Sequence, residues 1–487
     1  MGARFFMTQD PRRWLALGVI LSATLLGVLD FLIVNLALTS IQRTIGATEA
    51  QVQLTVAFYG LSFAVFLITG GRLGDIYGRK RVFQIGMAGF TLSSALCGFA
   101  QSPLQLIVFR IVQGAFAALM SPQVLATIQV LFEGDERDKA TGFVGATVGI
   151  GSLLGNVVGG WLVGANLLGL EWRPIFFVNV PIGIVAIILA QILLHESKAA
   201  TARRLDVSGA LIAGAALFLL IFPIAEGREK GWPWWAFAMI AVSGAIAYYF
   251  VGFEKRLARR GGSPLIGMEL FESSGYVRGL GAILMLFCGL SSFSFVIARF
   301  LQDGLRVSPQ QTGIIFAALS LSFFIFSLGA VKMVRAIGPV TLLWGLGILQ
   351  VGQVLLIALC LFYKGHLNPY WLMPVLFFYG AGQGLAVPQV IRQTLNNVGT
   401  QNAGAASGLL STVQQIAFSL GVSVVGGVFY AFADKGASAD SFARGTAAAF
   451  VLNFCFVFAA RVLVARNIKQ GAPVVKSKSE TAVAVEM

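Results

Sequence analysis

The chain contains 487 residues, of which 57% are hydrophobic and only 11% are charged, and its formal net charge is +14. Because soluble domains usually carry about 25% charged residues, this composition excludes a water-soluble monomer and predicts an integral membrane protein. The positive charge fits an excess of Lys and Arg in cytoplasmic loops, which is the positive-inside rule. It gives no reason to expect nucleic acid as a partner.

Apolar segments long enough to cross about 30 Å of hydrocarbon recur along the whole chain. In lipid the backbone must satisfy its own hydrogen bonds, and continuous segments of this length do so as α-helices. The first segment is too long for the core of a cleaved signal peptide and predicts a signal anchor. We expect fourteen transmembrane helices, at residues 13–36, 51–71, 82–100, 103–127, 140–164, 174–194, 207–226, 235–253, 278–301, 309–331, 338–361, 371–391, 403–431 and 445–465.

Two basic loops, residues 195–206 and 254–277, flank the seventh and eighth predicted helices. Transporters built from two similar six-helix halves bind their substrate at the midplane between the halves. The even number of helices and the distribution of Lys and Arg predict a multi-pass protein of the cell (inner) membrane with both termini in the cytoplasm. The predicted divisions are a six-helix half (1–195), a linker with two inserted helices (196–276), a second six-helix half (277–466) and a disordered cytoplasmic tail (467–487).

An enzyme is not expected, since the sequence offers no nucleophile–base set, metal-ligand cluster or phosphate-binding loop. The four cysteines lie in apolar segments without a Cys-x-x-Cys pair, so we interpret them as small apolar residues. The two histidines, His195 and His366, lie at span ends. We therefore expect neither a cofactor nor a metal.

Asp30 is a carboxylate near the middle of the first predicted span. An ionisable group in hydrocarbon costs several kcal/mol unless it faces a wet cavity or a partner. Arg110, in the fourth span, has a matching depth: at 1.5 Å per helical residue, both lie about 10 Å below the outer surface. We expect Asp30 to take up and release a proton with Arg110 as its partner. A static ion pair that orders the bundle is the alternative.

The loop after the second span reads Gly-Arg-Leu-Gly-Asp-Ile-Tyr-Gly-Arg-Lys-Arg, residues 71–81. It resembles the signature loop of the major facilitator superfamily, Gly-x-Leu-x-Asp-x-x-Gly-Arg-Lys. The resemblance implies an all-α major facilitator fold in which this loop latches the two halves and controls switching; a plain topology anchor is the alternative. The latch residues that the resemblance implies are Gly71, Gly74, Asp75, Gly78, Arg79 and Lys80.

Two further segments are similar to proton-linked members of that family. The first span reads Leu-Asp-Phe-Leu-Ile-Val-Asn-Leu-Ala-Leu, residues 29–38, and resembles an element of the fourteen-helix drug:proton antiporter branch, the multidrug efflux permease type. Arg110-Ile-Val-Gln113-Gly114 resembles the Arg-x-x-Gln-Gly element of proton-linked members. The stretch Trp172 to Gly183 also resembles that branch.

The fifth span carries glycines at the spacing of the family's antiporter motif. The family normally has a Gly-Pro pair where this chain has Gly155-Asn156, so a helix-kinking proline is missing. Asn156 offers a hydrogen bond between helices in its place. The residues of this motif are Gly151, Gly155, Asn156, Gly159 and Gly160.

The second half carries no acid deep in its predicted spans. Either Asp30 also contacts cationic substrates, or the substrates are neutral, zwitterionic or anionic. Arg299 and Arg392 lie near span ends, where long cationic side chains can reach the membrane interface. Candidate substrate-cavity residues are the neutral hydrogen-bonding side chains Asn35, Gln113, Gln383, Gln389, Gln414 and Gln415.

Together these patterns predict a proton-coupled exporter of small, largely apolar drugs or toxic compounds that works by alternating access. Its expected partners are the lipid bilayer, protons and a small hydrophobic or amphipathic substrate, with the need for a periplasmic adaptor left open. A dedicated metabolite or siderophore exporter, a proton symporter for uptake and a non-transporting membrane sensor are the alternatives. The direction of substrate movement separates an exporter from a symporter.

Overall fold

The computed structural model describes residues 12–198, 206–227, 230–260, 262, 264–265, 268–398, 403–433 and 438–469. Within these ranges the protein is almost entirely helical. The long helices are α2 (Arg13–Ile45), α3 (Glu49–Tyr77), α4 (Arg79–Phe99), α5 (Pro103–Leu131), α6 (Gly134–Gly164), α7 (Pro174–Phe177) continued by α8 (Asn179–Leu193), α9 (Val207–Gly227), α10 (Trp234–Arg259), α11 (Ser274–Arg299) continued by η3 (Phe300–Gly304), α12 (Pro309–Ile337), α13 (Val340–Tyr363), α14 (Leu372–Leu395), α15 (Ala403–Phe432) and α16 (Ala439–Lys469).

Each of the fourteen predicted spans falls on one of these helices or helix pairs, which confirms the predicted fold class. Thirteen of the described segments are long and apolar enough to cross a membrane. The remaining span is α14, which is 24 residues long but interrupted by glycine, proline and glutamine. Most of the predicted tail, from residue 470 onward, lies outside the described residues.

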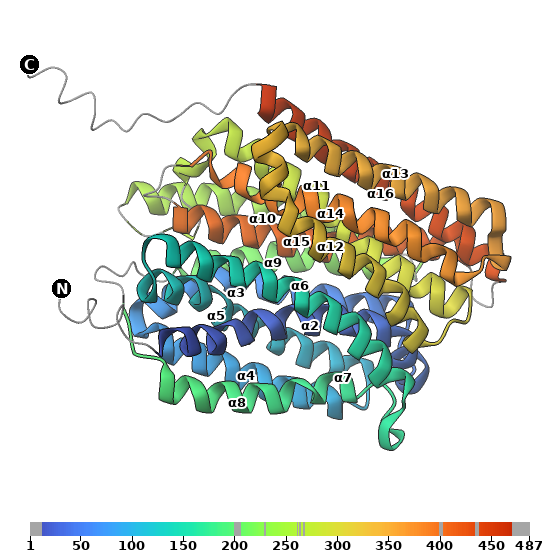
Figure 1. Ribbon diagram of the computed structural model, residues 1–487, viewed down its shortest axis with the longest axis horizontal. Coiled ribbons are helices and arrows are strands. Elements are labelled where there is room, and N and C mark those ends of the chain that lie inside the picture. The colour runs from blue at the N-terminus through green and yellow to red at the C-terminus, as the bar shows by residue number, and fades with distance from the viewer. Residues whose placement is uncertain are drawn as a thin grey trace, which may run out of the picture.

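The helices form two groups that lie side by side in Figure 1. Helices α2 to α8 pack on one another as the N-terminal group, and α11 to α16 pack as the C-terminal group. Helix α10 packs on α9, and α9 contacts both α3 and α15, so the inserted pair lies against the junction between the groups. The residue limits given above for the two halves stay a prediction.

The second helix of each group begins with the same capping arrangement. The Thr48 hydroxyl caps α3 by accepting from the Gln51 backbone N–H, and Gln51 Oε1 accepts from the Thr48 backbone N–H at 2.9 Å. Ser308 and Gln311 make the equivalent exchange at α12. Because each capping box satisfies two otherwise unpaired N–H groups, it stabilises the start of α3 and the start of α12 in the same way.

The two groups meet mainly along α3 with α15 and along α6 with α12. Small residues let the backbones of α6 and α12 touch. A Cβ on Gly160 would lie 2.5 Å from the carbonyl oxygen of Pro309, and one on Gly313 would lie 2.3 Å from the carbonyl oxygen of Asn156. Close approach through small residues is the usual basis of helix association in membranes, and here it joins one group to the other.

Candidate functional site

Asp30 and Arg110 meet inside the N-terminal group. Arg110 Nη1 donates to Asp30 Oδ2 at 2.5 Å, and both side chains are fully buried. The other carboxylate oxygen accepts from Gln113 Nε2 at 2.9 Å and from Asn179 Nδ2 at 3.1 Å. Three helices, α2, α5 and α8, therefore contribute to one charged and hydrogen-bonded site. A buried charge is tolerated only with such partners.

The guanidinium of Arg110 also contacts an aromatic ring. Its carbon lies 4.1 Å from the centroid of the Tyr59 ring, within the range of a cation–π contact. Arg110 Nε donates to the carbonyl oxygen of Thr55 at 3.4 Å, whereas Nη2 has no hydrogen-bond partner among the described atoms. Tyr59 therefore adds an aromatic contact to a guanidinium whose hydrogen bonds are only partly satisfied.

A cavity of about 340 Å³ lies between the two groups, next to this site. Its lining combines aromatic rings with hydroxyl and amide groups, and no ionisable acid or base of the described chain is part of it except the phenol of Tyr59. The aromatic residues are Phe31, Tyr59, Phe63, Phe287, Phe316, Phe323 and Phe418. The polar residues are Thr24, Ser121, Ser152, Asn156, Ser291, Ser294, Ser320, Gln383 and Gln415.

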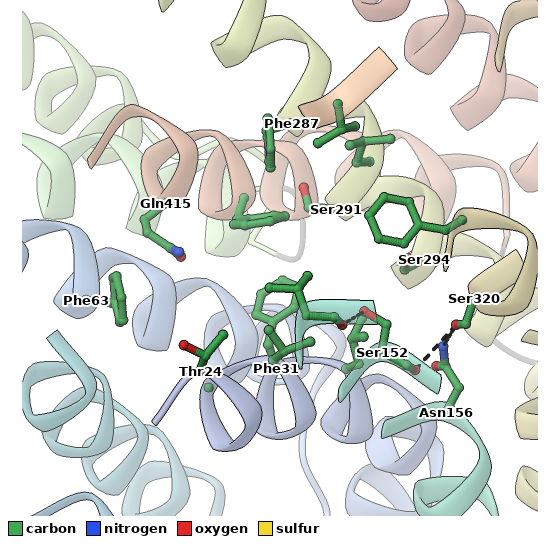
Figure 2. Close-up of a pocket in the computed structure, with 18 of the residues that line it drawn as sticks. Thr24, Phe31, Phe63, Ser152, Asn156, Phe287, Ser291, Ser294, Ser320 and Gln415 are labelled. Carbon is green, nitrogen blue, oxygen red and sulfur yellow. Dashed lines mark hydrogen bonds between the residues drawn. The ribbon is translucent and has the colours of Figure 1, made fainter. Parts of the chain in front are cut away.

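Figure 2 shows that the two groups contribute to opposite walls of the cavity. Phe31 and Phe63 come from the N-terminal group, and Phe287 comes from α11 across the space. The Phe31 and Phe418 rings bring the two walls into contact, with centroids 4.7 Å apart. At one side Asn156 Nδ2 donates to Ser320 Oγ at 2.9 Å, which links α6 to α12 directly (Figure 2).

The predicted cavity residues separate into two sets. Gln383 and Gln415 line the cavity. Gln113 belongs to the Asp30 site instead, and the Asn35 side chain donates to the carbonyl oxygen of Phe31 within its own helix. Gln389, which is 3% exposed, and Gln414 are not among the described lining residues. Sequence alone does not show which face of a helix is turned to the cavity, and this decides between the two sets.

The glycines of the predicted antiporter motif serve helix packing. A Cβ on Gly151, Gly155 or Gly159 would meet side chains of α2, at 3.3, 3.2 and 2.4 Å respectively. Gly160 faces α12 instead. The glycines of this motif therefore allow α6 to pack closely against α2, which carries Asp30, and against α12 of the C-terminal group. Asn156 adds a polar contact between the two groups.

The predicted latch loop, residues 71–81, is helical except at Gly78, because α3 continues to Tyr77 and α4 begins at Arg79. This segment is bound mainly to its own group. Arg79 Nη2 pairs with Asp75 Oδ1 at 3.1 Å, and Arg79 Nη1 donates to the carbonyl oxygen of Ala126 on α5 at 3.3 Å. The Lys80 backbone N–H donates to Glu196 Oε1 at 3.1 Å. Glycine is needed in this loop, because Gly78 has a φ of 113° and a Cβ there would lie 2.3 Å from Glu196.

The remaining two latch glycines lie against α5. A Cβ on Gly74 would lie 2.1 Å from Gln123 Oε1, whereas one on Gly71 would meet only Pro122 at 3.6 Å. Arg72 of the same loop donates to the carbonyl oxygen of Pro264, in the segment before α11. The loop therefore contacts the chain that connects the two groups.

Arg299 forms a second buried charged cluster that the sequence does not reveal. Its position near a span end predicts the membrane interface, yet it is only 3% exposed. Arg299 pairs with Asp303 at 2.8 Å and donates to Thr39 Oγ1 at 3.0 Å and to Gln42 Oε1, both on α2. These bonds join α11 to the C-terminal end of α2, beyond the cavity. Arg392, by contrast, is exposed.

Comparison with known proteins places these features in a family. The chain is 39% identical to a probable actinorhodin transporter of Streptomyces coelicolor over 88% of this chain and 74% of that protein. It is 32% identical to a puromycin resistance protein of Streptomyces alboniger over 94% of this chain and 90% of that protein. It is 33% identical to the multidrug resistance protein Stp of Mycobacterium tuberculosis over 83% of this chain and 73% of that protein.

Solved structures agree in fold. A crystal structure of the peptide transporter POT has a TM-score of 0.67 at 15% identity and covers 94% of this chain and 96% of its own. The crystal structure of a D-xylose-proton symporter has a TM-score of 0.65 at 15% identity, and the match covers 92% of this chain and 96% of that one. The family model described as Major Facilitator Superfamily matches residues 20–422. The chain belongs to the Major Facilitator Superfamily, which confirms the prediction of a multi-pass membrane transporter rather than an enzyme.

Proposed function

We propose that the protein exports small, largely apolar compounds across the cell (inner) membrane in exchange for protons. The observation that carries this proposal is the fully buried Asp30–Arg110 pair beside an uncharged cavity at the junction of the two helix groups. Relatives named for actinorhodin transport and for puromycin and multidrug resistance support export as the direction.

In this proposal the two groups rock about the cavity, which opens to each side of the membrane in turn. With both termini in the cytoplasm, the C-terminal end of α2 is the outer end. Hydrogen bonds between α2 and the end of α11 with η3 then close the outer side. Arg299 donates to Thr39 and Gln42, and Gln302 Nε2 donates to the carbonyl oxygen of Leu36 at 2.9 Å. Outward opening must break them, and we assign the loop of Asp75 and Arg79 to the matching closure on the cytoplasmic side.

Proton exchange follows from the chemistry of Asp30. As a carboxylate it is balanced by Arg110, and as a neutral acid it can occupy the same buried site without that partner. Opening to the outside admits a proton to Asp30, and opening to the cytoplasm lets it leave. Coupling requires that the protein does not carry the substrate and the proton at the same time. Binding of one must therefore follow release of the other.

Inverted membrane vesicles with an acidic lumen and a luminal pH reporter test the proposal. Addition of uncharged aromatic compounds should release luminal protons from vesicles containing the wild-type chain, together with uptake of the compound, and lipophilic cations are tested in the same way for comparison. Asp30→Asn should abolish this flux. Glu226→Gln is the matched control, because Glu226 near the end of α9 pairs at 3.3 Å with Lys230, which follows that helix, and neither residue lines the cavity.

Three outcomes would change the assignment. Compound movement in the same direction as the proton would indicate a symporter. Full proton-coupled flux in Asp30→Asn would remove Asp30 from the proton path. The absence of flux with every compound would leave a narrow-substrate exporter or a sensor.

A further inference from the structure

The cavity offers nothing to neutralise a charged ligand. Seven aromatic side chains and a set of hydroxyl and amide groups form its described lining, and a carboxylate is not among them. Moving an unpaired ion into such a space is costly, whereas a flat aromatic molecule gains ring contacts and a few hydrogen bonds. The lining therefore fits an uncharged aromatic substrate that carries carbonyl or hydroxyl groups.

Such a substrate does not reach the proton site directly. Asp30 is fully buried, and neither it nor Arg110 lines the cavity. The next residue on α2, Phe31, does line the cavity, so the two sites are close but separated. A contact that spans the separation is needed if the substrate is to influence the proton.

Tyr59 provides that contact. It is 3% exposed, it lines the cavity, and its ring lies 4.1 Å from the guanidinium carbon of Arg110. Its backbone is held close to α5, because a Cβ on Gly114 would lie 2.4 Å from the carbonyl oxygen of Tyr59. One side chain on a fixed backbone therefore contacts both the substrate space and the partner of Asp30.

We propose that Tyr59 transmits the presence of an uncharged aromatic substrate to the Asp30–Arg110 pair, an inference that rests on the proposed function. A substrate ring packed in the cavity restricts the Tyr59 ring and holds it against the guanidinium. Arg110 then stays beside the Asp30 carboxylate, and the proton of Asp30 passes to water. Without a substrate ring this added packing on Tyr59 is absent, so Arg110 is held less firmly and Asp30 can take up a proton from hydronium in the aqueous phase. Tyr59 is a positioning residue and does not itself transfer the proton.

Proton release on binding measures this coupling without transport. The purified full chain, in weak buffer with a pH indicator, is titrated with 9,10-anthraquinone, which has no ionisable group. Binding is followed separately by equilibrium dialysis. We expect the wild type to release a proton on binding, and to bind tetraphenylphosphonium at least about tenfold more weakly than the anthraquinone.

Variants at one position separate the ring from the hydroxyl. At saturating anthraquinone, Tyr59→Leu should release less than about a third of the protons that the wild type releases, whereas Tyr59→Phe should release as many protons as the wild type. If Tyr59→Leu does not fold, Tyr59→Met removes the ring while a flexible side chain fills the space. Tyr248→Leu, at a position 85% exposed on α10, is the control and should behave as wild type.

The outcomes distinguish this inference from the proposed function. If a folded Tyr59→Leu or Tyr59→Met variant, saturated with anthraquinone, releases as many protons as the wild type, the role of Tyr59 is overturned but the proposed function is not. Tighter binding of tetraphenylphosphonium than of anthraquinone would overturn the uncharged substrate class. Saturable binding to the wild type without any proton release would overturn proton coupling itself, and with it both proposals.

Discussion

Replacing Asp30 by Asn leaves the charge of Arg110 buried without a balancing carboxylate. Both side chains are fully buried in the wild type, and the carboxylate accepts three hydrogen bonds, from Arg110, Gln113 and Asn179. An amide supplies one acceptor oxygen, and its NH₂ group would face donors. Removing one member of a buried ion pair costs about 3–5 kcal/mol, most of it from the charge left behind. We expect a loss of stability of that order.

A double variant tests whether the uncompensated charge is the cause. Thermal unfolding of the purified protein should show a lower Tm for Asp30→Asn and for Arg110→Gln. The double variant Asp30→Asn/Arg110→Gln should recover most of the loss, because neither charge remains. Proton-driven transport should be absent from all three. A single variant with wild-type Tm, or a double variant whose losses simply add, would refute this account of the site.

Three further predictions follow from other contacts. Gly160→Ala should push α6 away from α12, lower the free energy of unfolding by about 1–3 kcal/mol and impair transport. Gly244 on α10 has open space around it, so Gly244→Ala should leave Tm and transport unchanged. Arg299→Gln should weaken the closure at the proposed outer end, so that a membrane-impermeant maleimide added outside labels a Ser294→Cys reporter several-fold faster; equal rates would contradict this role. Exchange of one proton for an uncharged molecule moves one net charge. A membrane potential imposed with valinomycin and K⁺ at equal pH should therefore drive export by the wild type but not by Asp30→Asn. An export rate that does not depend on the potential would contradict this stoichiometry.

The sequence predicts the fold well because membrane helices leave a strong local pattern. Length and hydropathy define each span. The Arg-x-x-Gln-Gly resemblance and equal depth in the bilayer make Arg110 a candidate partner for Asp30, but only the packing of α2 on α5 shows the contact. Tyr59 could not be predicted in the same way, since an aromatic residue in an apolar span is ordinary and its importance depends on which helix face meets α5. Arg299 shows the same limit: its position near a span end is compatible with lipid headgroups or with another helix, and only the packing of α2 against α11 decides.

The two helix groups repeat one polar junction with different charge. In the N-terminal group, Asn179 on the last helix bonds to Asp30 on the first. In the C-terminal group, Asn453 on the last helix, α16, donates to the carbonyl oxygen of Gly289 at 2.8 Å and to Ser292 Oγ at 3.1 Å, both on the first, α11.

The C-terminal junction is held by amides and a hydroxyl. Gln353 Nε2 completes it by donating to Asn453 Oδ1 at 2.8 Å, and no carboxylate takes part among the described residues. An amide network holds helices together but cannot exchange a proton at physiological pH. Of these two corresponding junctions, only the N-terminal one therefore has a group that can serve the proton exchange proposed above. A cycle that carries one proton inward and an uncharged molecule outward moves one net charge, so a potential of 100 mV adds about 2.3 kcal/mol to the driving force.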